Sequence, residues 1–125
     1  MSGAKRTKVL VVEDELLVRI GVRDLIDDCG YEPIEAAHAA EALSILERDT
    51  EIKIVIADIA IPCPIGGLTL AKTIRSKWPP IDLIITSGKI EPTADDLPAR
   101  AKFLPKPFTA GDLSAVLHGF SGPAS

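Results

Sequence analysis

Five polar side chains that could do chemistry stand where short apolar runs of the sequence end. Asp58 ends the run KIVIA, and Glu13 and Asp14 follow the run KVLVV. Ser87 follows LIIT, and Lys106 follows KFLP. Each of them could simply cap a helix or sit in a turn. However, the carboxyl ends of parallel strands meet at one edge of a sheet, where α/β proteins bind their ligands. We therefore treat the five residues as one candidate site.

Three carboxylates in close array would repel one another and attract a cation. Two like unit charges about 4 Å apart repel by about 4 kcal/mol at an effective dielectric constant of about 20. A hard divalent cation such as Mg²⁺, or Mn²⁺ in its place, suits oxygen ligands and also takes phosphate oxygens from a substrate. Asp58 could then act as a nucleophile that forms an aspartyl phosphate. Lys106 and Ser87 would contact the phosphoryl oxygens.

Strand and helix patterns alternate along the chain that must hold these residues. Ile54, Val55 and Ile56 are consecutive and β-branched, as is typical of a strand buried on both faces. The expected strands are KVLVV (8–12), EPIEA (32–36), the run ending at Asp58, LIIT (83–86) and KFL (102–104), and the expected helices run from about Glu15 to Cys29, through Ala39, Leu43 and Leu46, from Gly67 to WPP, and onward from a Thr109 cap. Pro33 cannot donate a ladder hydrogen bond, which places its strand at an edge. This order predicts an α/β protein with a doubly wound parallel sheet, helices on both faces and right-handed crossovers.

The segment between the last two expected strands departs from a regular helical pattern. In KIEPTADDLPARAKF (89–103), Pro92 can begin a helix and Pro98 should end it. What remains, around Thr93 to Leu97, is marginal as a helix unless Leu97 and Ile90 pack against the sheet. We therefore expect a short or irregular fourth helix that moves relative to the sheet.

The composition excludes several classes of protein. The chain has 125 residues, of which 46% are hydrophobic, and this suits one domain with a substantial core. The formal net charge of −4 argues against a nucleic-acid surface. We see neither a signal segment nor an apolar run long enough for a bilayer, so we expect a cytoplasmic protein without membrane contact. Cys29 and Cys63 form no CxxC pair and are expected to be reduced, and His38 and His118 lack a second ligand at metal-binding spacing.

The set of residues and its spacing resemble the receiver domain of bacterial two-component response regulators, from Lys8 to about Phe120. The resemblance implies a flavodoxin-like sheet of five parallel strands in the order 2-1-3-4-5. It also implies a site with these members: the acidic metal ligands Glu13 and Asp14, the phosphoacceptor and metal ligand Asp58, the metal ligand Ala60 through its backbone carbonyl, the switch hydroxyl Ser87, the switch aromatic Phe103, and the phosphoryl-binding Lys106 with a cis peptide bond to Pro107. Thr86 stays open as the switch hydroxyl, although Ser87 is followed by a small residue, Gly88, as in the family.

The turn after Asp58 departs from the family pattern. Many receivers have a Met-Pro-Gly turn leading to an Asp-Gly or Asn-Gly pair, whereas this sequence reads IAIPCPIGGL, with Gly66 at the polar position. We expect a stiffer turn. Ala60 would bind the metal through its backbone alone, so its side chain does not affect that contact. Glu13 stands where aspartate is commoner, and its longer side chain suits a contact through water.

Three other classes of protein share part of this pattern. A haloacid-dehalogenase-type phosphatase needs a second aspartate two residues after the nucleophile, where this chain has Ala60. A flavodoxin-type nucleotide binder needs a phosphate-binding loop after the first strand, where this chain has the acidic sequence EDELL. A degenerate receiver that binds a partner without phosphorylation stays an alternative, although all the acceptor groups are present.

The resemblance implies a phosphoacceptor rather than an enzyme, with at most self-phosphorylation and self-dephosphorylation activity. A histidine kinase or histidine phosphotransfer protein would supply the phosphoryl group to Asp58, and an unknown downstream protein would respond to it. We expect a receiver domain at residues 8–120, an N-terminal extension at 1–7 and a C-terminal tail at 121–125. Because this length leaves no room for an output domain, we expect a stand-alone regulator that signals through protein–protein contacts.

Overall fold

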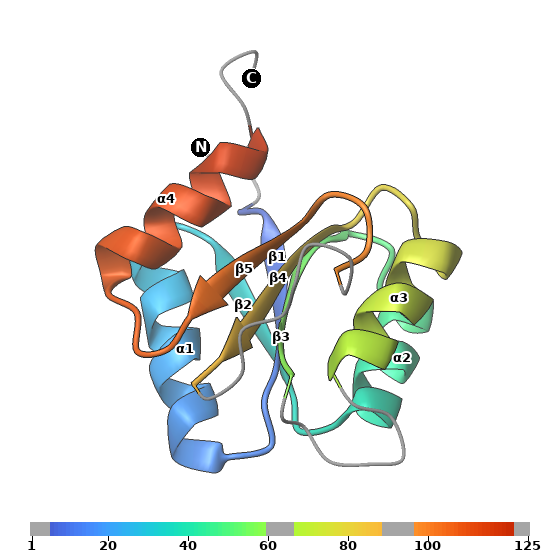
Figure 1. Cartoon of the computed structure of the whole chain (residues 1–125), viewed down its shortest axis with the longest axis horizontal. Helices are drawn as coiled ribbons and strands as arrows, with labels where there is room; N and C mark the ends of the chain where they lie inside the picture. The colour runs from blue at the N-terminus through green and yellow to red at the C-terminus, as the bar shows by residue number, and fades with distance from the viewer. Residues whose placement is uncertain (1–5, 60–66, 89–96, 122–125) are drawn as a thin grey trace.

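The computed structural model describes residues 6–59, 67–88 and 97–121, which form an α/β structure (Figure 1). The elements in chain order are β1 (Lys8–Val12), α1 (Leu16–Asp28), β2 (Glu32–Ala36), α2 (Ala39–Arg48), β3 (Ile52–Asp58), α3 (Gly67–Lys77), β4 (Asp82–Ser87), β5 (Ala101–Pro105) and α4 (Ala110–Ser121). The strands lie where the sequence predicts them, and α1 is one residue shorter at each end than expected.

The five strands form one parallel sheet in the order β2-β1-β3-β4-β5, which confirms the predicted order. Helices α1 and α4 cover one face of the sheet, and α2 and α3 cover the other (Figure 1). The central strands β1, β3 and β4 are almost wholly buried, as their apolar runs predict. Strand β2, which contains Pro33, lies at an edge, again as predicted.

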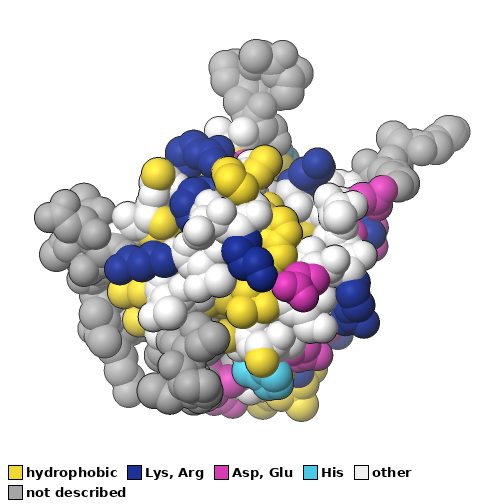
Figure 2. Space-filling model, turned by 90° about the vertical axis from the view of Figure 1, so that its right-hand side faces the viewer, with side chains coloured by type: hydrophobic (Ala, Val, Ile, Leu, Met, Phe, Trp, Pro, Cys, Tyr) yellow, Lys and Arg dark blue, Asp and Glu magenta, His cyan; other side chains and the backbone are white. Residues whose placement is uncertain are grey.

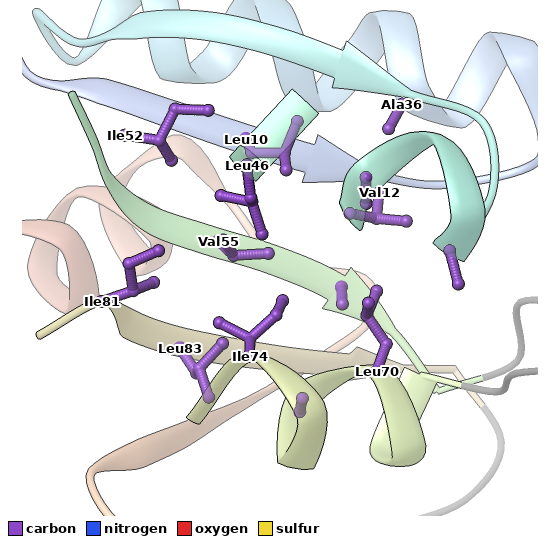
Figure 3. Packing of buried hydrophobic residues seen from close by; sticks show 14 of the residues in the cluster. Leu10, Val12, Ala36, Leu46, Ile52, Val55, Leu70, Ile74, Ile81 and Leu83 are labelled. Carbon is purple, nitrogen blue, oxygen red and sulfur yellow. The ribbon is translucent and has the colours of Figure 1, made fainter. Parts of the chain in front are cut away.

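The core consists of two hydrophobic clusters, one on each side of the sheet. Successive strand residues point to opposite faces, so Leu10, Val55 and Leu83 pack toward α2 and α3 while their neighbours pack toward α1 and α4. In Figure 3, Ile74 of α3 lies beside Val55 and Leu83 from the first cluster, to which Leu70 of the same helix also belongs. The second cluster is made of Val9, Val11, Val22, Ile26, Tyr31, Ile54, Ile56, Ile84, Leu104, Leu113 and Leu117. These two clusters hold the strand ends in fixed register.

Local capping explains where several helices begin and end. Helix α1 ends at Asp28 with the half-buried Cys29 as its C-cap, and Gly30 follows with a positive φ of 93°, a conformation that favours glycine. The ring of His38 accepts a hydrogen bond from the backbone N–H of Glu41 and caps α2. The side chain of Thr109 accepts a hydrogen bond from the N–H of Asp112 at 3.0 Å, which confirms Thr109 as the cap of α4.

The expected fourth helix falls largely on residues 89–96, which lie outside the described residues. The next residues, 97–100, form a bend and a turn, and the N–H of Ala101 donates to the carbonyl of Pro98 at 3.1 Å. The described chain is therefore not helical at Pro98, as the sequence predicts. Leu97 packs against the cluster that faces α2 and α3. The label α4 denotes the C-terminal helix of the described chain, and not the fourth helix that the sequence predicts around Thr93 to Leu97.

The face covered by α2 and α3 carries charges of both signs. Figure 2 shows Lys and Arg side chains interspersed with Asp and Glu across this face, with hydrophobic side chains between them. One such pair joins Lys77 of α3 to Glu47 of α2 at 2.9 Å. Within the ranges that the structure describes, no helix has the length and apolar character needed to cross a lipid bilayer.

Candidate functional site

The predicted site residues lie at one edge of the sheet because the strands end in register. Asp58, the last residue of β3, pairs with Thr86 of β4, and Ser87 pairs with the last residue of β5. Backbone hydrogen bonds continue the ladder beyond the strands: Glu13 N–H donates to the carbonyl of Ala36 at 3.0 Å, and Lys106 N–H donates to the carbonyl of Ser87 at 2.9 Å. The carboxyl ends of all five strands therefore meet at this edge.

Lys106 joins the two buried carboxylates of the site. Its Nζ lies 2.6 Å from Oδ2 of Asp58 and 2.8 Å from Oε1 of Glu13. The side chains of Asp58 and Glu13 are 9% and 7% exposed, and that of Lys106 is 22% exposed. The ammonium group therefore offsets the repulsion between two carboxylates that have little access to water. A positive charge at this place can also bind an anionic ligand that reaches Asp58.

Burial and pairing shift the pKa values of this group in ways that can be separated. Burial raises the pKa of Glu13 above its ordinary value, although the hydrogen bonds from Lys106 and from the Glu15 N–H oppose the rise. Burial alone would lower the pKa of Lys106, but its hydrogen bonds and proximity to Asp58 and Glu13 outweigh burial and raise it. Lys106 is therefore charged at neutral pH, whereas burial disfavours the charged form of Glu13.

Hydrogen bonds fix Glu13 on all sides. Besides Lys106 at Oε1, its Oε2 accepts from the backbone N–H of Glu15 at 3.1 Å, and its carbonyl accepts from Nη1 of Arg19 at 2.9 Å. Arg19 also donates from Nε to Oε1 of Glu35 at 3.0 Å. Arg19 thus holds the backbone of one site residue. The sequence pattern does not predict this contact, because it depends on how α1 packs against β1 and β2.

Asp14 differs from its neighbour because it is exposed. In the described part of the chain, no group of three His, Cys, Asp or Glu residues is arranged to hold a metal ion. The three carboxylates thus do not form the close array expected from the sequence; two of them meet at Lys106, and Asp14 stands at the rim. Ala60 lies outside the described residues. The carboxylates of Asp58, Glu13 and Asp14 nevertheless supply the oxygen donors that Mg²⁺ prefers, and Mg²⁺ needs only one or two carboxylates together with waters.

Both candidate switch hydroxyls are buried at the end of β4. Thr86 is 2% exposed and Ser87 is 4% exposed. Because side chains alternate along a strand, the two hydroxyls start on opposite faces of the sheet, Ser87 on the side of Ile85 and Thr86 on the side of Ile84. Ser87 is the residue whose carbonyl binds Lys106, and Gly88 follows it. The register between β4 and β5 thus brings the backbone of Ser87 next to that of Lys106.

Phe103 lies in β5 beside Ile85 of β4. It is half-buried and packs against the hydrophobic cluster under α2 and α3, on the same side of the sheet as Ser87. Phe103 therefore contacts the core rather than only solvent.

The peptide bond between Lys106 and Pro107 is cis, as the family resemblance implies.

Gly67, which the sequence suggests only as the start of a helix, lies against the backbone of Asp58. A Cβ at Gly67 would overlap the carbonyl of Asp58, and the Gly67 N–H donates to the carbonyl of Ile59 at 3.3 Å. Only a residue without a side chain lets α3 begin this close to β3. The Gly66-Gly67 pair in the sequence is a signal of such close approach.

An apolar groove of about 640 Å³ opens beside Lys106. Val18, Val22 and Leu25 of α1 form one wall, and Pro107 and Phe108 lie across from them. At the start of the same helix, Leu16, Leu17 and Val18 are all exposed, and Leu17 is the most exposed at 77%. Contiguous exposed apolar side chains are a feature of surfaces that bind other proteins.

Comparison with known proteins places this geometry in one family. The family profile described as response regulator receiver domain matches residues 9–118. The chain is 34% identical over 108 residues to the chemotaxis protein CheY1 of Helicobacter pylori (strain ATCC 700392 / 26695), an alignment that covers 82% of this chain and 86% of that protein. It is 42% identical over 113 residues to the sensor kinase CckA of Brucella abortus (strain 2308), covering 87% of this chain but only 12% of that protein.

Solved structures agree with the match in sequence. The response regulator receiver domain protein from Clostridium thermocellum has a TM-score of 0.81 to this chain at 27% identity, and the superposition covers 91% of this chain and 93% of that one. The residues that the family profile matches, 9–118, include the acidic residues at the sheet edge and the lysine after β5. The chain therefore belongs to the response regulator receiver domain family.

Proposed function

We propose that this receiver accepts a phosphoryl group on Asp58 from the phosphohistidine of a histidine kinase or phosphotransfer protein, and that a downstream protein responds to the change. The observation that carries the proposal is the single amine of Lys106 bound to both Asp58 and Glu13 at the ligand-binding edge of the sheet. A buried carboxylate beside a fixed cation combines a nucleophile with a group that binds phosphoryl oxygens.

The chemical step is a transfer of the phosphoryl group between two nucleophiles. An oxygen of the Asp58 carboxylate attacks phosphorus, the new O–P bond forms, and the N–P bond of the phosphohistidine breaks with its electron pair going to the imidazole. Lys106 would give up part of its contact with Asp58 and bind a phosphoryl oxygen, whose negative charge its ammonium group would stabilise. Mg²⁺ bound by Asp58, Glu13 and Asp14 would neutralise negative charge on the phosphoryl group. The product is an acyl phosphate on Asp58 and a free histidine on the donor.

The response to phosphorylation would run through β4 and β5. The hydroxyl of Ser87, which is buried at the strand end, would turn toward a phosphoryl oxygen and donate a hydrogen bond. Phe103 packs on the same side of the sheet and would move into the space that the hydroxyl leaves. We propose that this coupled change alters the surface that a target protein contacts.

The phosphodonor protein would approach over α1. Its histidine must come within bonding distance of Asp58, so the donor must rest on the rim of the site. The apolar groove beside Lys106 and the exposed Leu17 lie on this rim. Removal of apolar side chains from water is the main favourable contribution to most protein–protein association.

Phosphorylation by a small donor tests the proposal without the unknown kinase. The wild-type protein incubated with acetyl phosphate and Mg²⁺ should show a retarded band on Phos-tag electrophoresis, and the phosphate should be labile to both acid and alkali, as an acyl phosphate is. Asp58→Asn should show none, because the amide does not attack phosphorus. Phosphorylation of this variant at the wild-type level would move the acceptor to another residue. A wild-type protein that no donor phosphorylates would instead favour the degenerate receiver.

A further inference from the structure

We propose that Arg19 is a positioning residue for the metal and phosphoryl site, where it holds the peptide that joins Glu13 to Asp14. This inference rests on the proposed function. Arg19 lies near the start of α1 and reaches back to the end of β1, where its Nη1 donates to the Glu13 carbonyl at 2.9 Å. Its side chain is only 15% exposed, so water competes little for this contact.

Each other polar atom of Glu13 already has a partner from a different element. The N–H donates to Ala36 at the end of β2, Oε1 accepts from Lys106, and Oε2 accepts from the N–H of Glu15. Arg19 supplies the partner of the remaining atom, the carbonyl oxygen. That carbonyl belongs to the peptide plane that leads into Asp14, so the contact sets the direction in which Asp14 leaves the strand.

The geometry uses the planar fork of the guanidinium group. While Nη1 binds the Glu13 carbonyl, Nε binds Oε1 of Glu35 on the edge strand β2 at 3.0 Å. Arg23, one turn further along α1, contacts the other oxygen of Glu35 at 3.4 Å. Glu35 is therefore contacted by two arginines, and Arg19 makes the shorter of the two contacts. A lysine at position 19 has a single charged nitrogen and cannot bridge the carbonyl and the carboxylate in the same way.

A positioning role and a purely electrostatic role predict opposite effects on metal affinity. The positive charge of Arg19 repels any cation at the carboxylates, so its removal should strengthen metal binding if charge alone matters. If Arg19 instead orients the Glu13–Asp14 peptide, its removal should weaken binding, because metal sites depend on the groups that orient their ligands. The sign of the change thus separates the two roles.

The experiment measures Mn²⁺ affinity of the purified chain by electron paramagnetic resonance, together with the rate of phosphorylation by acetyl phosphate. Arg19→Gln should bind Mn²⁺ about tenfold more weakly than wild type. Arg23→Gln is the matched control, since it removes the same charge from the same helix and a contact to the same Glu35, but no contact to Glu13. Its affinity should stay within about twofold of wild type, because an exposed charge is screened by salt.

The outcomes separate this inference from the proposed function. If Arg19→Gln has the circular dichroism spectrum of wild type and binds Mn²⁺ equally or more tightly, the inference is wrong and the proposed function stands. If Arg19→Gln does not fold, Arg19→Lys keeps the charge, and weaker Mn²⁺ binding by this variant supports the inference while unchanged binding overturns it. A wild-type protein that binds no Mn²⁺ would overturn the metal site of the proposed function itself.

Discussion

The amine of Lys106 holds two carboxylates that come from different strands and have little access to water. Removal of one partner from such a group leaves like charges facing each other in a medium that screens them poorly. The raised pKa of Glu13 shows that burial already disfavours its charge even with Lys106 in place. Lys106 therefore affects both the stability of the fold and the pKa of Glu13.

Lys106→Met should destabilise the protein in a pH-dependent manner. Glu13 has a folded-state pKa above its ordinary value of 4.5, so the folded protein binds the proton more readily and loses stability as pH rises through the folded pKa. Lys106 opposes this rise, and its loss moves the pKa of Glu13 further upward. Urea unfolding with EDTA present should therefore show a stability deficit of Lys106→Met that grows from about pH 5 to about pH 7.

Lys53→Met is the control for that prediction. Lys53 lies in β3, the strand that ends at Asp58, but it is exposed near the opposite end of that strand. Its stability difference from wild type should be small and independent of pH over the same range. A constant deficit of Lys106→Met from about pH 5 to about pH 7 would contradict the coupling to Glu13.

At the scale of the elements, α3 begins in contact with the strand that carries Asp58. The close approach of Gly67 to the Asp58 carbonyl leaves no space for a side chain. The middle of α1 is different, since Gly21 has no atom within 4 Å of where its Cβ would be. Two glycines in helices of the same protein thus have different reasons to be present.

Gly67→Ala and Gly21→Ala should change stability in opposite directions. The first forces α3 away from β3 and should cost about 1–3 kcal/mol of unfolding free energy, as overpacked sites do. The second replaces glycine inside an exposed helix and should stabilise the protein by about 0.5–1 kcal/mol. Urea denaturation of both variants is the measurement. A stable Gly67→Ala protein with wild-type phosphorylation would show that α3 can shift without consequence for Asp58.

Leu17→Glu should separate phosphorylation by a protein donor from phosphorylation by a small molecule. Leu17 is exposed near the start of α1, so a charge there should not disturb the fold. It should slow phosphotransfer from a histidine kinase or phosphotransfer protein at least several-fold, because a charge replaces buried apolar area at the interface. The rate with acetyl phosphate should stay at the wild-type value. Equal slowing with both donors would place the effect at Asp58 rather than on the docking surface.

At the scale of the whole molecule, the site is formed from the ends of four strands, so a ligand there joins elements that otherwise meet only through the sheet. Glu13 follows β1, Asp58 ends β3, Ser87 ends β4 and Lys106 follows β5. A ligand that binds all four in the folded state and none in the unfolded chain stabilises the fold by mass action.

Beryllofluoride with Mg²⁺, a mimic of the phosphoryl group, should therefore raise the melting temperature. At about 100 times its dissociation constant, a ligand adds about 2.7 kcal/mol of stability, which corresponds to a shift of several degrees in a domain of this size. Differential scanning calorimetry with beryllium, fluoride and Mg²⁺ present together and singly is the measurement. Asp58→Asn should show no shift with the full mixture, and an equal shift in this variant would mean that the mimic binds elsewhere.

Local features of the sequence are enough to predict the class of fold and the sheet edge at which the candidate site residues lie. Runs such as that before Asp58 are β-branched and apolar throughout, and this local property marks central parallel strands whatever their neighbours are. Pro33 and Gly30 act in the same local way, through a missing N–H and a permitted positive φ. Because each strand end is visible in the pattern, the convergence of Glu13, Asp58, Ser87 and Lys106 could be predicted before any contact was known.

Only the tertiary structure decided how these residues meet. Lys106 lies 93 positions from Glu13 and 48 from Asp58 along the chain, and no local pattern states that its amine bridges these two carboxylates while Asp14 stays exposed. Likewise, Arg19 binds the Glu13 carbonyl because α1 packs back over the edge of the sheet. Such contacts depend on strand register and helix packing, which arise from the sum of many weak interactions across the core rather than from the identity of any single residue.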